Sequence, residues 1–199
     1  MTPATKTPTV LDRKAATKAD LQKELGWEKQ PRRAMLCIPT GMSDDLGGAL
    51  LEDVMAGLLT LPIQIVVVGK GSSEYGKYFS KLATDKPHKV AIVANDKDMI
   101  ENVLTASDLA LFCAPTAAED LQACLAHGIV PVSPASSTIV NYDPNQEAGN
   151  AFTYDQLTHW HCFAAAVRAV ETYRFPYDFK TIQKNAVAMS DEERESEEE

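Results

Sequence analysis

The stretch Leu61-Pro62-Ile63-Gln64-Ile65-Val66-Val67-Val68-Gly69-Lys70-Gly71 decides the fold. Its apolar run ends in four consecutive β-branched residues, which is typical of a strand buried on both faces of a parallel sheet. Gly69 and Gly71 allow the backbone to turn sharply at the carboxyl end of the strand, where open α/β sheets bind their ligands. Two glycines at this spacing are a weak signal, and a plain strand-to-helix turn is the commoner explanation.

The same order of strand, loop and helix recurs along the chain. We predict strands over residues 32–39, 63–68, 89–94, 109–113, 129–132 and 151–153, and helices over 11–25, 46–59, 74–83, 96–105, 117–126, 157–173 and 177–187. This alternation predicts an α/β fold, a single doubly wound, Rossmann-like parallel sheet of about six strands, and right-handed crossovers favour the order 3-2-1-4-5-6. A ligand crevice would then lie between the loops 40–45 and 114–119, with 69–72 nearby.

Composition gives the domain organisation. The chain has 199 residues, enough for one domain with a full core. Residues 1–10, rich in Thr and Pro, predict a flexible lead-in, residues 11–188 the Rossmann-like domain, and residues 189–199 an acidic, disordered tail. That tail contributes much of the formal net charge of −9.

The same composition excludes several classes of function. Net negative charge argues against nucleic acid and anionic membranes as partners. We find no apolar segment of membrane-spanning length and no secretory signal, so we expect a soluble, cytoplasmic protein. The cysteines lack CxxC spacing, and we expect them to be reduced core residues.

Several stretches resemble the glycogen and starch synthases, and they occur in the same order. The first is Lys14-x3-Lys18-x2-Leu21-Gln22-x-Glu24-Leu25-Gly26. It is followed by Val67-Val68-Gly69-Lys70-Gly71, Thr105-Ala106-Ser107-Asp108-Leu109-Ala110-Leu111, Ala123-Cys124-Leu125-Ala126-His127-Gly128-Ile129-Val130-Pro131-Val132, Asn141-Tyr142-Asp143-Pro144, Gly149-Asn150-Ala151-Phe152 and Lys184-Asn185-Ala186. The resemblance covers about residues 11–190 and is to the carboxyl-terminal, donor-binding half of these GT-B glycosyltransferases. It implies a Rossmann-like domain that, in that family, holds a nucleoside-diphosphate glucose.

The chain departs from that family at the positions that carry its chemistry. The Arg and Lys that grip the donor's diphosphate correspond to Gly41 and Leu46, and Glu119 is the only match to the catalytic glutamate. The glycine pair after the fifth strand is replaced by Ala135-Ser136-Ser137, and the aromatic residue that stacks on the base by Asn95. The acceptor-side half of a synthase has no counterpart in this sequence.

The distribution of basic residues, considered without the resemblance, also indicates that the crevice loops lack groups to bind a diphosphate. There is no Lys or Arg between Arg33 and Lys70, nor between Lys97 and Arg168, whereas the first crevice loop carries Asp44 and Asp45. Sites for a diphosphate use basic side chains, a metal, or several backbone N–H groups at a helix end. Only the last remains, and carboxylates at the mouth would oppose it.

The leading hypothesis is therefore a degenerate, non-catalytic relative of the synthases that acts as a binding or assembly module, for example as a homo-oligomer. The alternative is the donor-side subunit of a split glycosyltransferase whose acceptor half is another chain. In this case Glu119 would be catalytic. The candidate residues for contacting the nucleotide sugar, each supported only by a weak sequence signal, are Thr40, Gly41, Gly69, Gly71, Ser72, Thr116 and Glu119. A third hypothesis places a neutral or cationic small molecule in the same crevice.

We expect no cofactor and no metal ion. In His159-Trp160-His161-Cys162 the two histidines are two positions apart on a predicted helix, so they point in different directions and cannot chelate together. The acidic residues at 44, 45, 52 and 53 could hold magnesium, but helix capping and the helix macrodipole explain them more simply.

Overall fold

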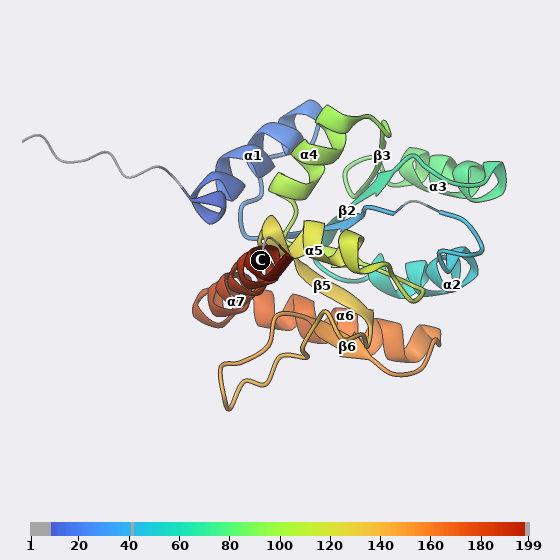
Figure 1. The fold of residues 1–199 in the computed structure, drawn as a ribbon. Helices are drawn as coiled ribbons and strands as arrows, with labels where there is room; N and C mark the ends of the chain where they lie inside the picture. Colours follow the sequence, from blue (N-terminus) through green and yellow to red (C-terminus); the bar gives the residue numbers. More distant parts are fainter. Residues whose placement is uncertain (1–8, 41, 198–199) are drawn as a thin grey trace, which may run out of the picture.

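The computed structural model describes residues 9–40 and 42–197, which form one α/β unit (Figure 1). Its six parallel strands have the order β3-β2-β1-β4-β5-β6, which confirms the predicted Rossmann-like sheet. The strands are β1 (Ala34–Ile38), β2 (Ile63–Val68), β3 (Val90–Val93), β4 (Leu109–Leu111), β5 (Val130–Pro134) and β6 (Phe152–Tyr154).

Seven helices surround the sheet within the described residues. They are α1 (Val10–Glu24), α2 (Gly48–Leu58), α3 (Ser73–Asp85), α4 (Lys97–Ala106), α5 (Ala118–Ala126), α6 (His159–Tyr173) and α7 (Pro176–Glu197). Helix α1 begins at Val10 because Thr9 caps it: the Thr9 side chain accepts from the Asp12 amide, and the Asp12 carboxylate accepts from the Thr9 amide. The rest of the predicted lead-in, residues 1–8, lies outside the described residues.

Strand β2 lies inside the sheet because its residues alternate between two hydrophobic cores. Ile65 and Val67 face the core that α2, α3 and α6 cover, whereas Val66 and Val68 face the core of α1, α4 and α5 (Figure 1). All six residues of the strand are buried. Its register with both neighbours, for example Leu36↔Ile65 and Ile65↔Val90, is the one expected for a strand hydrogen-bonded on both sides.

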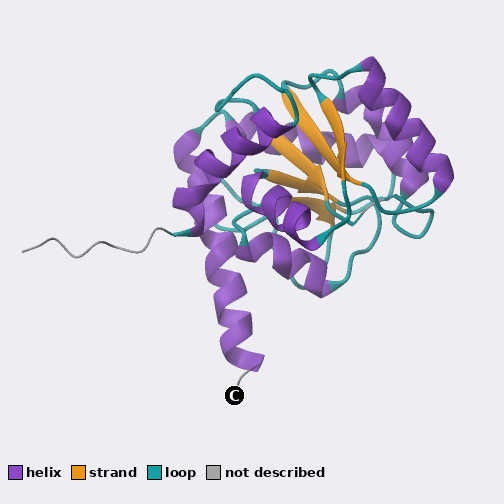
Figure 2. Ribbon diagram, turned by 90° about the horizontal axis from the view of Figure 1, so that it is seen from above, coloured by secondary structure: helices purple, strands orange, loops and turns teal. Residues whose placement is uncertain are grey.

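The sequence predicted a disordered tail from residue 189, whereas the described part of the chain remains helical there. Helix α7 continues to Glu197, and Figure 2 shows its last turns projecting from the body. Ser190 is still buried, and the Asn150 amide contacts the Met189 sulfur at 2.8 Å. Once packing has nucleated a helix, residues of high helix propensity such as Glu and Arg extend it at little cost. Residues 198–199 lie outside the described part.

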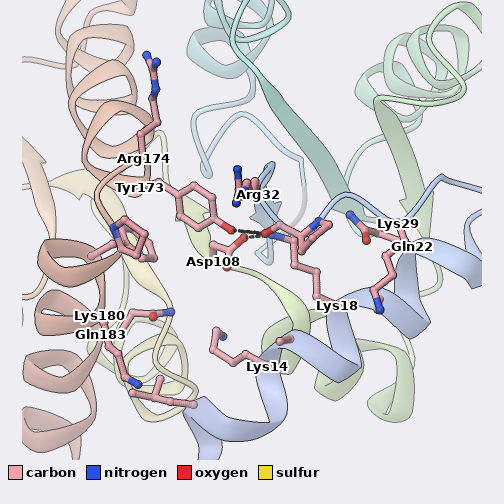
Figure 3. Close-up of a pocket in the computed structure, with 16 residues that line it drawn as sticks. Lys14, Lys18, Gln22, Lys29, Arg32, Asp108, Tyr173, Arg174, Lys180 and Gln183 are labelled. Atoms are coloured by element: carbon pink, nitrogen blue, oxygen red, sulfur yellow. Dashed lines mark hydrogen bonds and ion pairs between the residues drawn. The ribbon is translucent and has the colours of Figure 1, made fainter.

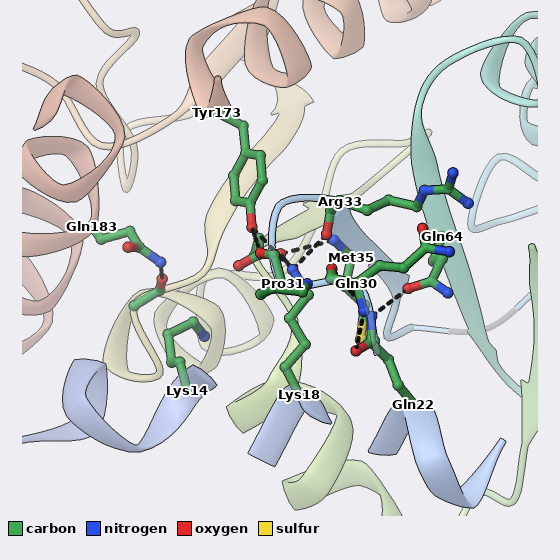
Figure 4. A network of polar contacts seen from close by, with 12 residues as sticks. Lys14, Lys18, Gln22, Gln30, Pro31, Arg33, Met35, Gln64, Tyr173 and Gln183 are labelled. Carbon is green, nitrogen blue, oxygen red and sulfur yellow. Dashed lines mark hydrogen bonds and ion pairs between the residues drawn. The ribbon is translucent and has the colours of Figure 1, made fainter. Parts of the chain in front are cut away.

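The amino-terminal edge of the sheet contains a buried polar network (Figure 4). The Lys18 ammonium lies 2.5 Å from the Asp108 carboxylate and also donates to the Arg33 carbonyl and the Tyr173 hydroxyl. Asp108 accepts a second bond, from the Met35 amide at 2.8 Å. We call Lys18, Asp108 and Tyr173 the amino-edge network. It joins two stretches that carry the family resemblance, around Lys18 and around Asp108, and so ties α1 to the start of β4.

Candidate functional site at the carboxyl edge of the sheet

The predicted site residues gather at the carboxyl edge of the sheet. Thr40 follows β1, the residues Gly69, Gly71 and Ser72 follow β2, and Thr116 and Glu119 lie between β4 and the first turn of α5. Because β1 lies between β2 and β4, these loops are neighbours, as the predicted crevice requires. Gly41 lies outside the described residues.

The loops after β1 and β2 are joined by backbone hydrogen bonds. The Met42 amide donates to the Lys70 carbonyl at 2.6 Å, and the Ser72 amide donates to the Met42 carbonyl at 2.8 Å. Gly71 has a φ of +140°, and a Cβ built on it would lie 1.6 Å from the Met42 carbonyl oxygen. Gly71 is therefore needed for the close approach of the two loops to each other.

A glycine is also required at position 69 by a close backbone contact. Its amide donates to the Val93 carbonyl at 2.8 Å, and an added Cβ would lie 2.9 Å from that same oxygen. The Gly-x-Gly pattern after β2 is thus explained by backbone packing against β3 and the loop after β1. This is the plain strand-to-helix turn that the sequence left open.

The amino terminus of α2 is closed by neighbouring groups. Its N-cap, Gly47, has a φ of +77° and no side-chain cap, and a Cβ there would lie 2.3 Å from the Cys113 carbonyl oxygen. The Gly48 amide already donates to the Ser43 carbonyl at 2.8 Å, and the Tyr75 ring lies against Gly48. The main-chain donors that could have received a phosphate are partly used and covered.

Asp44 is held at this edge by an aromatic hydroxyl. The Tyr75 hydroxyl donates to the Asp44 carboxylate at 2.6 Å, and this bond, followed by burial, raises the pKa of Tyr75 to about 12. Asp44 therefore positions the Tyr75 ring over α2. The sequence had suggested that Asp44 caps this helix, but its side chain makes no cap bond. Among the described residues no group of three or more His, Cys, Asp or Glu side chains is arranged to hold a metal ion.

The loop after β4 offers little for an anion. The Thr116 hydroxyl donates to the Ala114 carbonyl at 2.9 Å, so its proton is used locally. Helix α5 has Ala117 as its N-cap, without a side-chain cap bond, and places Glu119 and Asp120 in the first turn, both exposed. These carboxylates are stabilised by the positive end of the helix and would repel a diphosphate there.

The sequence reasoning missed two features of this edge. Lys70 lies in the loop beside Met42, and its side chain is exposed. The sequence analysis considered only Gly69 and Gly71, the glycines on either side of it. Beneath the edge, Cys113 and Cys162 are buried and hydrogen-bonded; this bond raises the pKa of the Cys113 thiol and lowers that of Cys162. No sequence signal links these two cysteines, because only the packing of α6 on the end of β4 brings them together.

The fold defines the class of protein. The chain matches the catalytic domain of starch synthase IV from Arabidopsis thaliana, bound to ADP and acarbose, with a TM-score of 0.78 and 18% identity over 98% of this chain and 45% of that one. It also matches an isolated carboxyl-terminal domain of a group 1 glycosyltransferase from Francisella tularensis, with a TM-score of 0.62 and 12% identity, covering 86% of this chain and 90% of that domain. The fold is that of one half of a GT-B glycosyltransferase.

Sequence relatives narrow this class. No protein-family model matches. The glycogen synthase of Thermosipho melanesiensis is 28% identical over 173 residues, and that of Pseudothermotoga lettingae is 25% identical over 187 residues. These alignments cover 82% and 89% of this chain but only 36% and 38% of the relatives. The chain is a glycogen synthase-like domain that spans less than half the length of the curated relatives it matches, which confirms the resemblance inferred from the sequence.

Within the described residues, no helix is long and apolar enough to cross a membrane.

Proposed function

We propose that this domain does not transfer sugar by itself and acts as a binding or assembly module. The observation that carries the proposal is the closed phosphate end of the crevice. Met42, in the loop after β1, is hydrogen-bonded to the loop after β2. Cys113 packs against Gly47 and Tyr75 against Gly48, at the start of α2. A donor diphosphate would have to displace these groups.

Charge supports the same proposal. A diphosphate is normally held by basic side chains or by free amides at a helix end. The loop after β1 carries Asp44 and Asp45, and the first turn of α5 carries Glu119 and Asp120; all four are exposed, and neither segment contains a Lys or Arg. Their summed field would reduce the affinity for an anionic donor.

An exposed apolar site at the same edge supports assembly. Leu157 and Trp160 lie just after β6, at the start of α6, and their exposed fractions are 53% and 70%. In the GT-B resemblance this is the edge that the other half of the enzyme faces. Tryptophan is enriched at protein interfaces, where it contributes most to affinity when it is fully covered. We assign a second copy of this chain as the partner that covers it.

Two measurements test the proposal. Thermal unfolding with millimolar ADP, UDP or their glucose conjugates and magnesium should show no midpoint shift that depends on the crevice residues Thr116 and Lys70. A ligand at one hundred times its Kd would add about 2.7 kcal/mol, and roughly 5–10 °C for a chain of this size. Glucan elongation by the purified chain, or a midpoint shift that Thr116→Ala or Lys70→Ala reduces, would overturn the non-catalytic reading.

The assembly part is tested by light scattering coupled to size exclusion. Trp160→Ala should shift the protein from dimer to monomer, while Tyr177→Ala, an equally exposed aromatic residue on α7, should not. A wild-type monomer at high micromolar concentration would contradict self-assembly.

One observation favours the alternative, a donor-side subunit of a split glycosyltransferase. Lys70 places an exposed cation beside the loop after β1, where a diphosphate would approach. In that case Glu119 would serve as the catalytic carboxylate, with Thr40, Gly69, Gly71, Ser72 and Thr116 around the donor, and a separate acceptor-half chain would supply further cations. Co-purification with such a chain, together with nucleotide-sugar binding lost in Lys70→Ala, would establish this alternative.

A further inference from the structure

A second site lies at the opposite, amino-terminal edge of the sheet (Figure 3). A cavity of about 680 Å³ opens between α1, the segment before β1 and the corner where α6 meets α7. This volume is within the range of small-molecule pockets. Asp108, directly before β4, and Tyr173, at the end of α6, form part of its wall.

The lining of this cavity is strongly basic in a chain that is acidic overall. The sequence has 19 basic and 28 acidic residues, yet six basic residues and one acidic residue line the cavity. The basic residues are Lys14, Lys18, Lys29, Arg32, Arg174 and Lys180, and the acidic residue is Asp108. Like charges around one concave, partly desolvated space repel one another and raise the local concentration of anions.

Hydrogen bonds within the protein hold two of these lysines in place. Lys14 donates to the carbonyls of Leu104, Thr105 and His127, at 3.5, 3.2 and 2.9 Å, and Lys18 belongs to the amino-edge network. Burial lowers the pKa of Lys14 to about 8, although the negative charge of Asp108 opposes this shift. Their donors are occupied, so neither bonds a ligand directly; the charge of Lys18 is balanced by Asp108, and Lys14 supplies positive potential.

Three other cations have donors to spare. Lys29 and Arg32 belong to the segment before β1, and Lys180 lies on α7 across the cavity. All three side chains are exposed. In the described part of the chain none of them forms an ion pair. Arg174 is different, because it pairs with Glu171 at 3.0 Å and extends away from Asp108 in Figure 3.

The remaining wall is apolar. Leu11, Ala15, Pro31, Pro176 and Phe179 line the cavity between the cations. A bare inorganic ion would leave this surface uncovered, whereas an organic body attached to a phosphate would bury it. The cavity thus combines a basic rim with an apolar interior.

We propose that this cavity binds a phosphorylated organic small molecule, with its phosphate held by Arg32, Lys29 and Lys180 and its organic part against Pro31 and Phe179. Arginine provides a planar pair of donors for the phosphate oxygens, and the lysines provide further charge-assisted bonds. The site is on the other edge of the sheet from the crevice, so it is independent of the proposed function.

The test compares two variants with the same change in net charge. Isothermal titration with ribose 5-phosphate at constant ionic strength should show saturable binding to the native chain. Arg32→Ala/Lys180→Ala should weaken it by about tenfold or more, since two charge-assisted contacts are lost. Lys77→Ala/Lys81→Ala, which removes two exposed lysines of α3 far from the cavity, should leave the Kd unchanged.

Three outcomes would overturn the inference: no saturable binding at millimolar ribose 5-phosphate, an equal loss in both double variants, or equal affinity for inorganic phosphate. The last would remove the organic part of the ligand. Repeating the thermal unfolding with ADP in the Arg32→Ala/Lys180→Ala variant separates this site from the crevice, because a midpoint shift that persists there comes from binding in the crevice.

Discussion

The two edges of the sheet have opposite characters. At the amino-terminal edge, side chains within the family-like stretches form a buried ion pair and hydrogen bonds, and cations surround a cavity. At the carboxyl edge, the loops are acidic and closed by contacts to Met42, Tyr75 and Cys113. Lys18, Asp108 and Gly71, which belong to the stretches that resemble the synthases, therefore have contacts that hold the fold together.

The largest effect should follow from breaking the amino-edge network. Asp108→Ala leaves the Lys18 ammonium buried without its counterion and the Met35 amide without its acceptor. We expect a loss of about 3–5 kcal/mol in the free energy of unfolding, measured by urea denaturation. Adding Lys18→Met should recover part of this loss because no unpaired charge then remains; a loss below about 1 kcal/mol in Asp108→Ala would contradict the network's role.

At the carboxyl edge, the backbone approach of the two loops can be broken instead. Gly71→Ala must place a methyl group into the Met42 carbonyl at a φ of +140°, and should cost at least about 2 kcal/mol of stability. Gly76→Ala is the matched control, since it lies in α3 with no atom within 4 Å of its new Cβ and should stabilise by about 0.5–1 kcal/mol. If both variants behave alike, the closed crevice is not maintained by Gly71.

A buried amide pair offers a smaller effect. The Gln22 side chain donates to the Gln64 carbonyl oxygen at 2.7 Å, which explains the polar residue in the middle of β2. Gln64→Leu should cost about 1–3 kcal/mol because a buried amide loses its partner, while the double change with Gln22→Leu should cost less than the single one. Chemical denaturation measures both, and strictly additive costs would show that the two amides do not interact.

Alkaline pH should weaken the whole domain. Burial raises the pKa of the Cys37 thiol to about 11 from 9.0, so the native thiol keeps its proton where the unfolded one ionises. Its contribution is fully present below pH 9 and is lost as pH rises to 11, by roughly 1.4 kcal/mol for each pH unit. Denaturation at pH 7.5 and 10 should show a smaller pH-dependent loss in Cys37→Ala than in the wild type. An identical pH dependence would exclude Cys37 as a source.

The sequence predicted the six strands, their order and the location of the crevice loops, because hydrophobic periodicity and the handedness of crossovers fix these features. It did not predict that α7 continues past the buried Ser190 into the acidic residues. The roles of Thr40, Thr116 and Glu119 as ligand contacts stay predictions.

What the sequence by itself determined was the class of fold, the resemblance to half of a synthase, and the shortage of cations in the crevice loops. Only the tertiary structure decided that Gly69 and Gly71 serve backbone packing, that Lys18 meets Asp108, and that Lys29, Arg32 and Lys180 line one cavity. The reason is physical: periodicity and charge counts depend on residues close together in the chain. Contacts between residues 90 positions apart, such as Lys18 and Asp108, exist only once the layers have packed.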